Sequence, residues 1–226
     1  MSISPHFITL DGIDGVGKTT FVPIVCEILK SYNLPVLSTR EPGGTEIGEQ
    51  LRSLLLQGPP VHSDTEILLM FAARAEHLQQ VIRPALANGQ WVVCDRFTDA
   101  TYAYQGAGRG ILKERIAQLE TWVQGDLRPD LTLLLDAPPN VSLQRIKQRY
   151  SWEERFDQDR FEQEQIQFFR RVRQGYLTLA KAHPERYYVI NATLSIEVIT
   201  EQIKQILHPI LVAGDNLENV KTLSSL

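Results

Sequence analysis

A complete phosphate-binding pattern begins at Gly12 and ends at Thr19. Residues 12–19 match G-x-x-x-x-G-K-[ST] and follow the apolar run Phe7-Ile8-Thr9-Leu10. Glycines let such a loop curl so that its N–H groups face phosphate oxygens, Lys18 adds positive charge toward the β- and γ-phosphates, and the Thr19 hydroxyl is placed to ligate Mg²⁺. A helix beginning at Lys18 points its positive end at the same anion. The pattern predicts a nucleotide polyphosphate site rather than a glycine-rich turn with an uninvolved lysine. Its predicted contacts are Gly12, Ile13, Asp14, Gly15, Val16, Gly17, Lys18, Thr19 and the following Thr20.

Polar or glycine-rich residues directly follow four apolar runs of the sequence, including the run that precedes the phosphate loop. These are Asp11, the segment Arg40-Glu41-Pro42-Gly43-Gly44, the pair Asp95-Arg96, and Asp136. The competing interpretation of any single one of them is a turn residue or a helix cap without a role in a site. Their accumulation around a phosphate loop favours a shared site.

Asp95 and Arg96 end the apolar run Trp91-Val92-Val93-Cys94. A carboxylate at this position can hold Mg²⁺ through water. A guanidinium beside it can bridge two phosphates and neutralise the charge with which they repel each other. The competing interpretation is a salt bridge at the end of a strand.

Five short runs rich in branched apolar residues predict the strands that would position these groups. They are Phe7–Leu10, Val36–Thr39, Trp91–Asp95, Leu131–Asp136 and Tyr187–Asn191. Stretches with helical spacing lie between them. Alternating strands and helices predict an α/β fold with a parallel sheet, helices on both faces, and a ligand crevice at the carboxyl ends of the strands.

The bulk properties predict one domain over residues 1–212, followed by a loose tail over 213–226. Basic residues number 23 and acidic residues 27, so the net charge of −4 gives no general attraction to nucleic acid or to an anionic membrane. Cys26 and Cys94 form no C-x-x-C pair, which suits a reducing compartment. No signal peptide and no long apolar run is visible, and we expect a cytoplasmic protein.

Three further segments make the pattern more specific. Thr39-Arg40-Glu41-Pro42-Gly43-Gly44-Thr45, the stretch from Asp95-Arg96-Phe97 to Tyr104-Gln105-Gly106, and Arg128-Pro129-Asp130-Leu131 accompany the phosphate loop. Together they resemble the thymidylate kinase family, which converts dTMP to dTDP with ATP. The resemblance runs from about Phe7 to about Ile206. It implies the three-layer P-loop NTPase fold with a five-stranded parallel sheet and a short lid, Mg²⁺ with ATP as phosphoryl donor, and a homodimer.

The resemblance also implies roles for individual residues. Lys18, Asp95 and Arg96 belong to the catalytic set, and Thr19, Asp11 and Asp95 to the metal site. Phe71 would stack on thymine, Arg74 would bond a pyrimidine carbonyl, and Tyr104 would lie against the deoxyribose. The full set expected around dTMP is Asp11, Glu41, Pro42, Phe71, Arg74, Arg96, Thr101, Tyr104 and Gln105. Residue types alone favour a different interpretation, in which Phe71 belongs to the core and Arg74 to the surface.

A polar stretch with mixed charge predicts the lid at about residues 148–160. The phosphate loop carries the acid Asp14 where one branch of the family carries an arginine, so positive charge has to come from elsewhere. Arginines on a closing lid can supply it and expel water, and Arg149 and Arg155 are the leading candidates. The alternative is a solvated helical hairpin with surface ion pairs.

Two other functions compete with phosphorylation of dTMP. The nearer one is a kinase for another nucleotide or for a deoxynucleoside. The other is a regulatory GTPase, although the sequence has no N-K-x-D segment and no D-x-x-G after the third strand. A homodimer would use an apolar helix such as the one with Ile67, Leu68 and Leu69.

Overall fold

The structure is a computed structural model that describes the backbone of residues 6–150 and 158–223, and the side chains of residues 6–148 and 165–212. Its centre is a sheet of five parallel strands in the order β2-β3-β1-β4-β5. These strands are β1 (Phe7–Asp11), β2 (Val36–Arg40), β3 (Trp91–Asp95), β4 (Leu131–Asp136) and β5 (Tyr187–Asn191). The five predicted strands are therefore confirmed, with end points within one residue.

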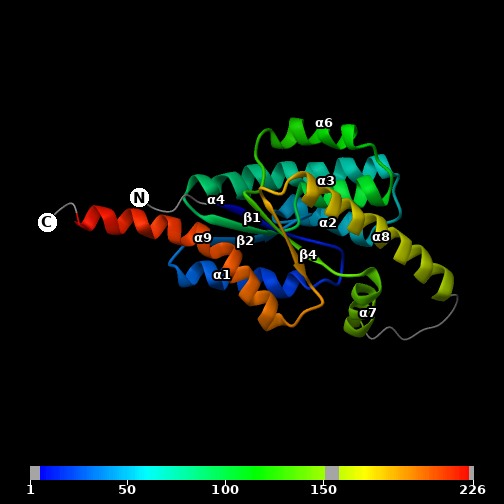
Figure 1. Cartoon of the computed structure of the whole chain (residues 1–226). Coiled ribbons are helices and arrows are strands. Elements are labelled where there is room, and N and C mark those ends of the chain that lie inside the picture. Colours follow the sequence, from blue (N-terminus) through cyan, green and yellow to red (C-terminus); the bar gives the residue numbers. More distant parts are fainter. Residues whose placement is uncertain (1–5, 151–157, 224–226) are drawn as a thin grey trace.

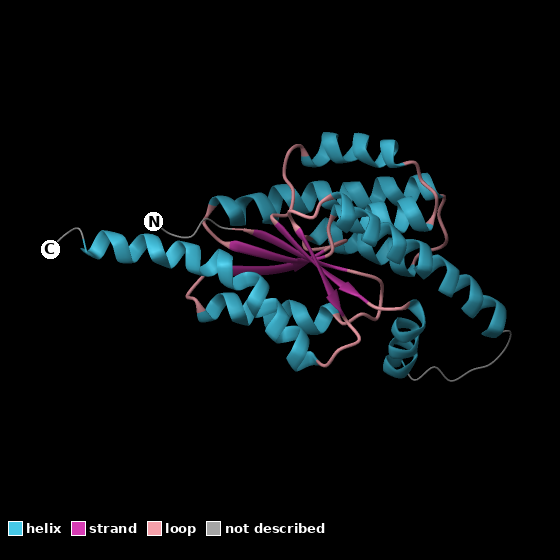
Figure 2. Cartoon of the chain, viewed as in Figure 1, coloured by secondary structure: helices cyan, strands magenta, loops and turns pink. Residues whose placement is uncertain are grey.

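Helices cover both faces of this sheet, as predicted (Figure 2). Along the chain they are α1 (Lys18–Ser31), α2 (Glu46–Gln57), α3 (Ser63–His77), the π-helical η1 (Leu78–Ile82), α4 (Arg83–Ala87), α5 (Thr98–Thr101), the π-helical η2 (Tyr102–Gly108), α6 (Lys113–Gln124), α7 (Pro139–Tyr150), α8 (Gln158–Ala182) and α9 (Ile196–Leu223). Helix α1 begins at Lys18, where the phosphate loop predicts it. α1 and α9 lie together on one side of the sheet, and α3, α4, α6 and α8 lie on the other (Figure 1).

The three central strands, β1, β3 and β4, are buried on both faces, because successive side chains point to opposite sides and helices cover each side. In β1, Ile8 and Leu10 pack in the main core with residues of α1 and α9. Phe7 points the other way and packs with Leu78 and Ile82 of η1. This two-sided burial explains why these central strands are nearly continuous apolar runs, whereas the edge strands β2 and β5 keep partly exposed residues.

The ends of the chain differ from the sequence prediction at one point. Helix α9 continues to Leu223, whereas loss of periodicity predicts a loose tail from residue 213.

Residues 151–157, which form the middle of the predicted lid, lie outside the described residues. Within the described part of the chain, no helix combines the length and apolar character needed to span a membrane.

Candidate active site

The phosphate loop fills the turn between β1 and α1, and two of its glycines leave no room for a side chain. Gly12 has φ 134°, and a Cβ there would lie 2.3 Å from the carbonyl oxygen of Leu135. Gly15 has φ 79°, and its Cβ would lie 2.4 Å from the carbonyl oxygen of Ser142. Positive φ and close backbone contact both require glycine. The loop is thus held against β4 and α7.

Lys18 is tied to this loop by its own side chain. Its Nζ donates to the carbonyl oxygens of Gly12 and Ile13, at 3.0 Å each. Burial, followed by repulsion from the Arg96 guanidinium, lowers the pKa of Lys18 to about 8. The lysine therefore stays charged at neutral pH and loses its proton at moderately alkaline pH.

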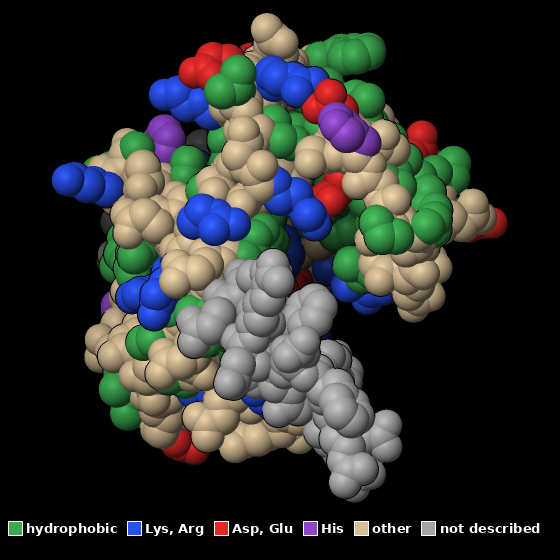
Figure 3. Space-filling view, turned by 90° about the vertical axis from the view of Figure 1, so that its right-hand side faces the viewer, with side chains coloured by type: hydrophobic (Ala, Val, Ile, Leu, Met, Phe, Trp, Pro, Cys, Tyr) green, Lys and Arg blue, Asp and Glu red, His purple; other side chains and the backbone are tan. Residues whose placement is uncertain are grey.

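A cavity of about 780 Å³ opens beside the loop, and we call it the loop cavity. It is lined by Asp14, Gly15, Gly17, Lys18, Thr19, Thr20, Arg52, Asp95, Arg96, Leu143, Arg145, Ile146, Lys147, Gln165 and Phe169. Figure 3 shows a hollow on this face of the molecule, with Lys and Arg side chains around it. The concentration of basic groups suits a polyphosphate.

A second cavity of about 300 Å³, the side cavity, lies between β2, α2, α3 and η2. It is lined by Asp14, Arg40, Glu41, Pro42, Arg52, Leu55, Leu56, Glu66, Met70, Arg74, Asp95, Arg96, Phe97, Ala100, Thr101, Tyr104, Gln105 and Arg109. Its wall combines apolar side chains such as Leu55, Met70 and Phe97 with convergent charged and polar groups, which suits a small molecule that carries charge. Four residues, namely Asp14, Arg52, Asp95 and Arg96, line both cavities, so the two spaces meet at them.

Arg96 is the centre of the polar contacts at this junction. Its Nη2 donates to Asp14 Oδ1 at 2.7 Å and to the Tyr104 hydroxyl at 2.9 Å, and its Nη1 donates to the Tyr176 hydroxyl at 3.1 Å. The backbone of Arg96 has φ 70°, which is rare outside glycine and tends to occur at functional sites. Burial acts to raise the pKa of Asp14, but the facing guanidinium of Arg96 opposes it. The pKa of Asp14 is therefore held below its usual value.

A buried cluster holds the β2–α2 loop against α3. Glu41 accepts from Arg74 Nε at 2.7 Å and lies 3.0 Å from His77 Nδ1. Because a carboxylate only accepts, Nδ1 of His77 is the donor to Glu41, and Nε2 lies 2.7 Å from the Thr39 hydroxyl. The sequence alone gave no reason to select His77, which is completely buried.

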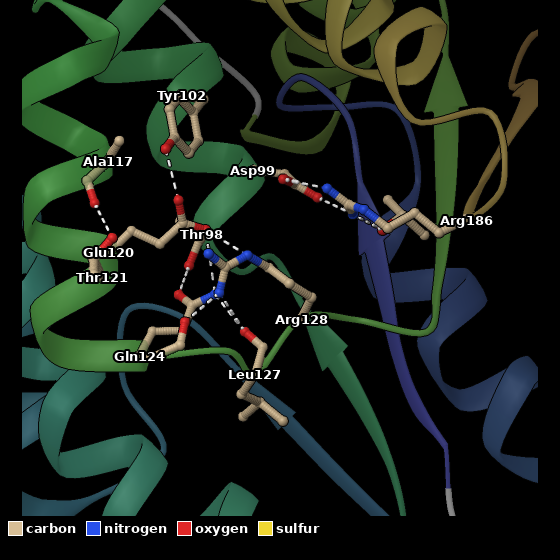
Figure 4. A network of polar contacts seen from close by, with 12 residues as sticks. Thr98, Asp99, Tyr102, Ala117, Glu120, Thr121, Gln124, Leu127, Arg128 and Arg186 are labelled. Carbon is tan, nitrogen blue, oxygen red and sulfur yellow. Dashed lines mark hydrogen bonds and ion pairs between the residues drawn. The ribbon is translucent and has the colours of Figure 1, made fainter.

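The segment that carries Thr101, Tyr104 and Gln105 is anchored from outside the cavities (Figure 4). Arg186 donates two hydrogen bonds to the carboxylate of Asp99, at 2.6 and 3.0 Å. Tyr102 donates to Glu120 at 2.6 Å, and Arg128 pairs with the other oxygen of Glu120 at 3.0 Å. These contacts fix the direction in which η2 presents its side chains.

The residues present fit a magnesium ion only in part. Asp95 Oδ1 is buried and has no hydrogen-bond partner among the described residues, and Thr19 exposes its side chain in the same cavity. Carboxylate and hydroxyl oxygens suit Mg²⁺, which commonly takes one or two protein ligands together with substrate phosphates. Asp11 differs from the prediction because it is completely buried and lines neither cavity.

Burial determines both the contacts and the pKa of Asp11. Its Oδ1 accepts from the Tyr176 hydroxyl at 3.1 Å. Burial, with a contribution from the nearby charge of Asp99, raises the pKa of Asp11 to about 7. Asp11 therefore lies behind Tyr176 and Arg96 rather than against a ligand.

Most of the other predicted site residues come together. Glu41, Pro42, Arg74, Thr101, Tyr104 and Gln105 line the side cavity, and Gly15, Gly17, Lys18, Thr19 and Thr20 line the loop cavity. Gly12, Ile13 and Val16 line neither cavity and form the underside of the loop. The side chains of Arg149 and Arg155 lie outside the described residues.

Phe71 is placed differently from the prediction. Its ring is 2 % exposed, packs with Ile67 and Ile116, and lines neither cavity. The preceding residue, Met70, faces the side cavity, because one step along an α-helix turns a side chain by about 100°. The guanidinium of Arg74 lies 4.7 Å from the Phe71 ring, so Phe71 supports Arg74 from behind.

Sequence reasoning also missed residues that line the cavities. Arg52 lines both, and its Nη1 donates to the carbonyl oxygen of Pro42 at 2.7 Å. Glu66 and Met70 line the side cavity, whereas Arg145 and Lys147, which line the loop cavity, belong to the basic residues that precede the predicted lid in the sequence. These residues lie on amphipathic helices, where a charged side chain is ordinarily a solvated one, so the sequence carries no signal for Arg52 or Glu66.

Comparison with known proteins points in one direction. A family model described as thymidylate kinase matches residues 10–203. A thymidylate kinase of Neisseria meningitidis serogroup C is 53% identical over 207 residues, covering 91% of this chain and 97% of that one. One of Methylobacillus flagellatus is 48% identical over 202 residues, covering 89% and 96%. The crystal structure of thymidylate kinase from Ehrlichia chaffeensis superposes with a TM-score of 0.73 at 35% identity, covering 91% and 99% of the two chains.

Proposed function

The chain belongs to the thymidylate kinase family, and from that premise we propose how its residues phosphorylate dTMP with ATP. One observation carries the proposal. The loop cavity and the side cavity meet at four charged residues, so a donor phosphate in one can face an acceptor phosphate in the other. Direct in-line transfer of the γ-phosphoryl group requires this arrangement.

ATP occupies the loop cavity, with its phosphates on the backbone N–H groups of the loop and on Lys18. Lys18 then exchanges the carbonyl oxygens of Gly12 and Ile13 for phosphate oxygens. dTMP occupies the side cavity with its phosphate toward Arg96 and Arg52. The acceptor phosphate has a second pKa of about 6 and is mostly a dianion at neutral pH, so no general base is required.

Catalysis consists of positioning and neutralisation of charge. Arg96 is in contact with Asp14, and we propose that it turns to bridge the two phosphates when both substrates are bound. The Tyr104 hydroxyl accepts from the same Nη2 and the Tyr176 hydroxyl accepts from Nη1, and these two contacts steer the movement. The lid closes over the γ-phosphate, with Arg149 or Arg155 adding positive charge; Arg145 and Lys147 already line the loop cavity.

Thr19 and Asp95 are the residues that would hold Mg²⁺, and the bound ion would neutralise charge on the phosphate oxygens. Asp11 contributes indirectly, since it contacts Tyr176 and not the cavity.

The thymine ring lies among Met70, Phe97, Arg74, Thr101 and Gln105. Support comes from the polar atoms that these residues leave without partners among the described residues, Arg74 Nη1 and Gln105 Oε1. Glu41 and Pro42 lie nearer the sugar and phosphate, with Tyr104 against the deoxyribose.

We also propose a homodimer in the cytoplasm. Leu54 and Leu56 on α2, Leu68 on α3 and Trp122 on α6 are exposed apolar side chains on neighbouring helices, which is typical of an interaction surface. Ile67, which the sequence suggested for this surface, is in the core. Both cysteines are free and buried, which suits a reducing compartment. Sedimentation velocity tests the dimer, with Leu68→Glu as the variant expected to yield monomers.

The decisive assay measures ADP formation from ATP with dTMP, dUMP, dCMP, dGMP and thymidine in turn. We expect the highest kcat/KM for dTMP. Comparable turnover of another nucleotide or of thymidine would assign the chain to a different kinase specificity. Preferential binding of GTP, with slow hydrolysis and no effect of any acceptor, would instead indicate a GTPase.

A further inference from the structure

The amide of Gln105 is fixed by a carboxylate at the edge of the side cavity. Gln105 is 3 % exposed, and its Nε2 donates to Glu66 Oε1 at 2.7 Å. Its Oε1 is buried and has no hydrogen-bond partner among residues 6–148 and 165–212. A buried amide oxygen without a partner is costly, and this indicates that a ligand supplies the missing donor.

Glu66 determines which end of that amide faces away from it. A carboxylate accepts hydrogen bonds and donates none, so only the NH₂ end of Gln105 can face Glu66. Arg109 Nε also contacts Glu66 Oε1, at 2.9 Å. Arg109 can only donate, so if Glu66 were absent it would attract the amide oxygen of Gln105 and favour the reversed orientation.

The orientation matters because of what Arg74 offers in the same cavity. Arg74 Nε and Nη2 are bonded to Glu41 and Thr101, whereas its buried Nη1 has no partner among the described side chains. Among the described residues, Arg74 Nη1 is therefore an unused donor and Gln105 Oε1 an unused acceptor in the side cavity, apart from Asp95 Oδ1 at its junction with the loop cavity.

A 2,4-dioxopyrimidine such as thymine or uracil presents a carbonyl acceptor at C4 and an N–H donor at N3. Cytosine presents the reverse, an amino donor at C4 and an acceptor at N3. The pair from Arg74 and Gln105 matches the first ring and opposes the second.

We propose that Glu66 is a positioning residue that sets the specificity for a 2,4-dioxopyrimidine over cytosine, by holding Gln105 with its carbonyl toward the ring. The inference rests on the proposed placement of the base beside Arg74 and Gln105. Glu66 acts through Gln105, and the 5-methyl group of thymine takes no part.

The test compares kcat/KM for dTMP, dUMP and dCMP in the wild type and in Glu66→Met, which keeps the side-chain volume but removes the acceptor. We expect the dTMP/dCMP ratio to fall by at least about tenfold, which corresponds to about 1.4 kcal/mol. The dTMP/dUMP ratio should stay the same, because both rings present the same edge. If Glu66→Met does not fold, Glu66→Ala serves the same purpose. A folded variant of either kind with an unchanged dTMP/dCMP ratio overturns the proposal.

Two further variants refine the result. Glu66→Gln retains an oxygen that Arg109 holds toward Gln105, so its ratio should fall less than that of Glu66→Met. Asp64→Asn is the matched control, since Asp64 lies on the same helix and pairs with Arg115 at 2.7 Å without touching Gln105. Its ratio should equal the wild-type ratio, and an equal fall in both would also overturn the proposal.

Gln105→Ala separates this inference from the proposed base site. If it leaves the dTMP/dCMP ratio unchanged, Gln105 does not contact the base and the proposed placement fails. If it lowers the ratio while Glu66→Met does not, the base site stands and only the role of Glu66 fails.

Discussion

Arg96 Nη2 lies 2.7 Å from Asp14 Oδ1, although the two residues are 82 positions apart in the chain. The ion pair joins the end of β3 to the phosphate loop at the place where the two cavities meet. The side chain best placed to neutralise phosphates is therefore held ready by an acid of the loop. Asp14 is half exposed, so its carboxylate stays solvated when Arg96 turns from it to a phosphate. The exchange therefore leaves no buried charge without a partner.

Arg96→Ala is predicted to lower kcat by at least about 100-fold, because the variant loses a guanidinium that acts on the charge of the transition state. Arg96→Lys should recover little of this, since an ammonium cannot bridge two phosphates in the same way. Steady-state turnover checks the prediction, and circular dichroism should show a folded protein. Turnover like that of the wild type would remove Arg96 from the mechanism.

The pKa of Lys18, about 8, predicts an alkaline limit to ATP capture. Only the protonated lysine attracts phosphate, so kcat/KM for ATP should be constant below the pKa and fall as the pH rises through about 8. Asp14 is among the charges that raise the pKa of Lys18. Asp14→Asn should therefore move the falling limb to lower pH, and a limb that stayed in place would contradict this account.

Phe71 and Met70 are predicted to have opposite phenotypes. Phe71→Leu should lower the free energy of unfolding by about 1 kcal/mol through loss of core packing, with KM for dTMP nearly unchanged. Met70→Ala should raise KM for dTMP and change stability less. Urea denaturation and initial-rate kinetics measure both. A large rise in KM for Phe71→Leu alone would support stacking of Phe71 on thymine instead.

His77→Ala is predicted to weaken dTMP binding without touching the ligand. It leaves oxygens of Glu41 and Thr39 without a partner, at a cost of about 1–3 kcal/mol in stability, and loosens the acid that holds Arg74. KM for dTMP should rise more than kcat falls. His183→Ala is the control, because that histidine is 46% exposed and should tolerate the change. Equal effects of both variants on KM would refute the role of His77.

Local pattern made the scaffold predictable. The central strands β1, β3 and β4 are buried on both faces and are therefore nearly continuous apolar runs, and the edge strands β2 and β5 carry enough branched or aromatic residues to be recognised as strands. The phosphate loop was equally evident, because its glycines and Lys18 meet backbone requirements that few other residues satisfy. Residues that directly follow strands, such as Glu41, Asp95 and Arg96, could be selected because the carboxyl ends of parallel strands meet at one edge.

Contacts between distant segments decided the rest. The helical spacing of α3 did not distinguish which of Met70 and Phe71 faces the cavity, since that depends on where Ile111 and Ile116 pack. The π-helical turn of η2 changes the direction of Tyr104 and Gln105, and no short pattern predicts it. The sequence by itself determined that a nucleotide phosphate binds after β1, because backbone geometry there is local. Only the tertiary structure decided that Asp11 lies behind Tyr176, that Arg52 reaches both cavities, and that Glu66 holds Gln105, because each depends on side chains meeting across separate elements.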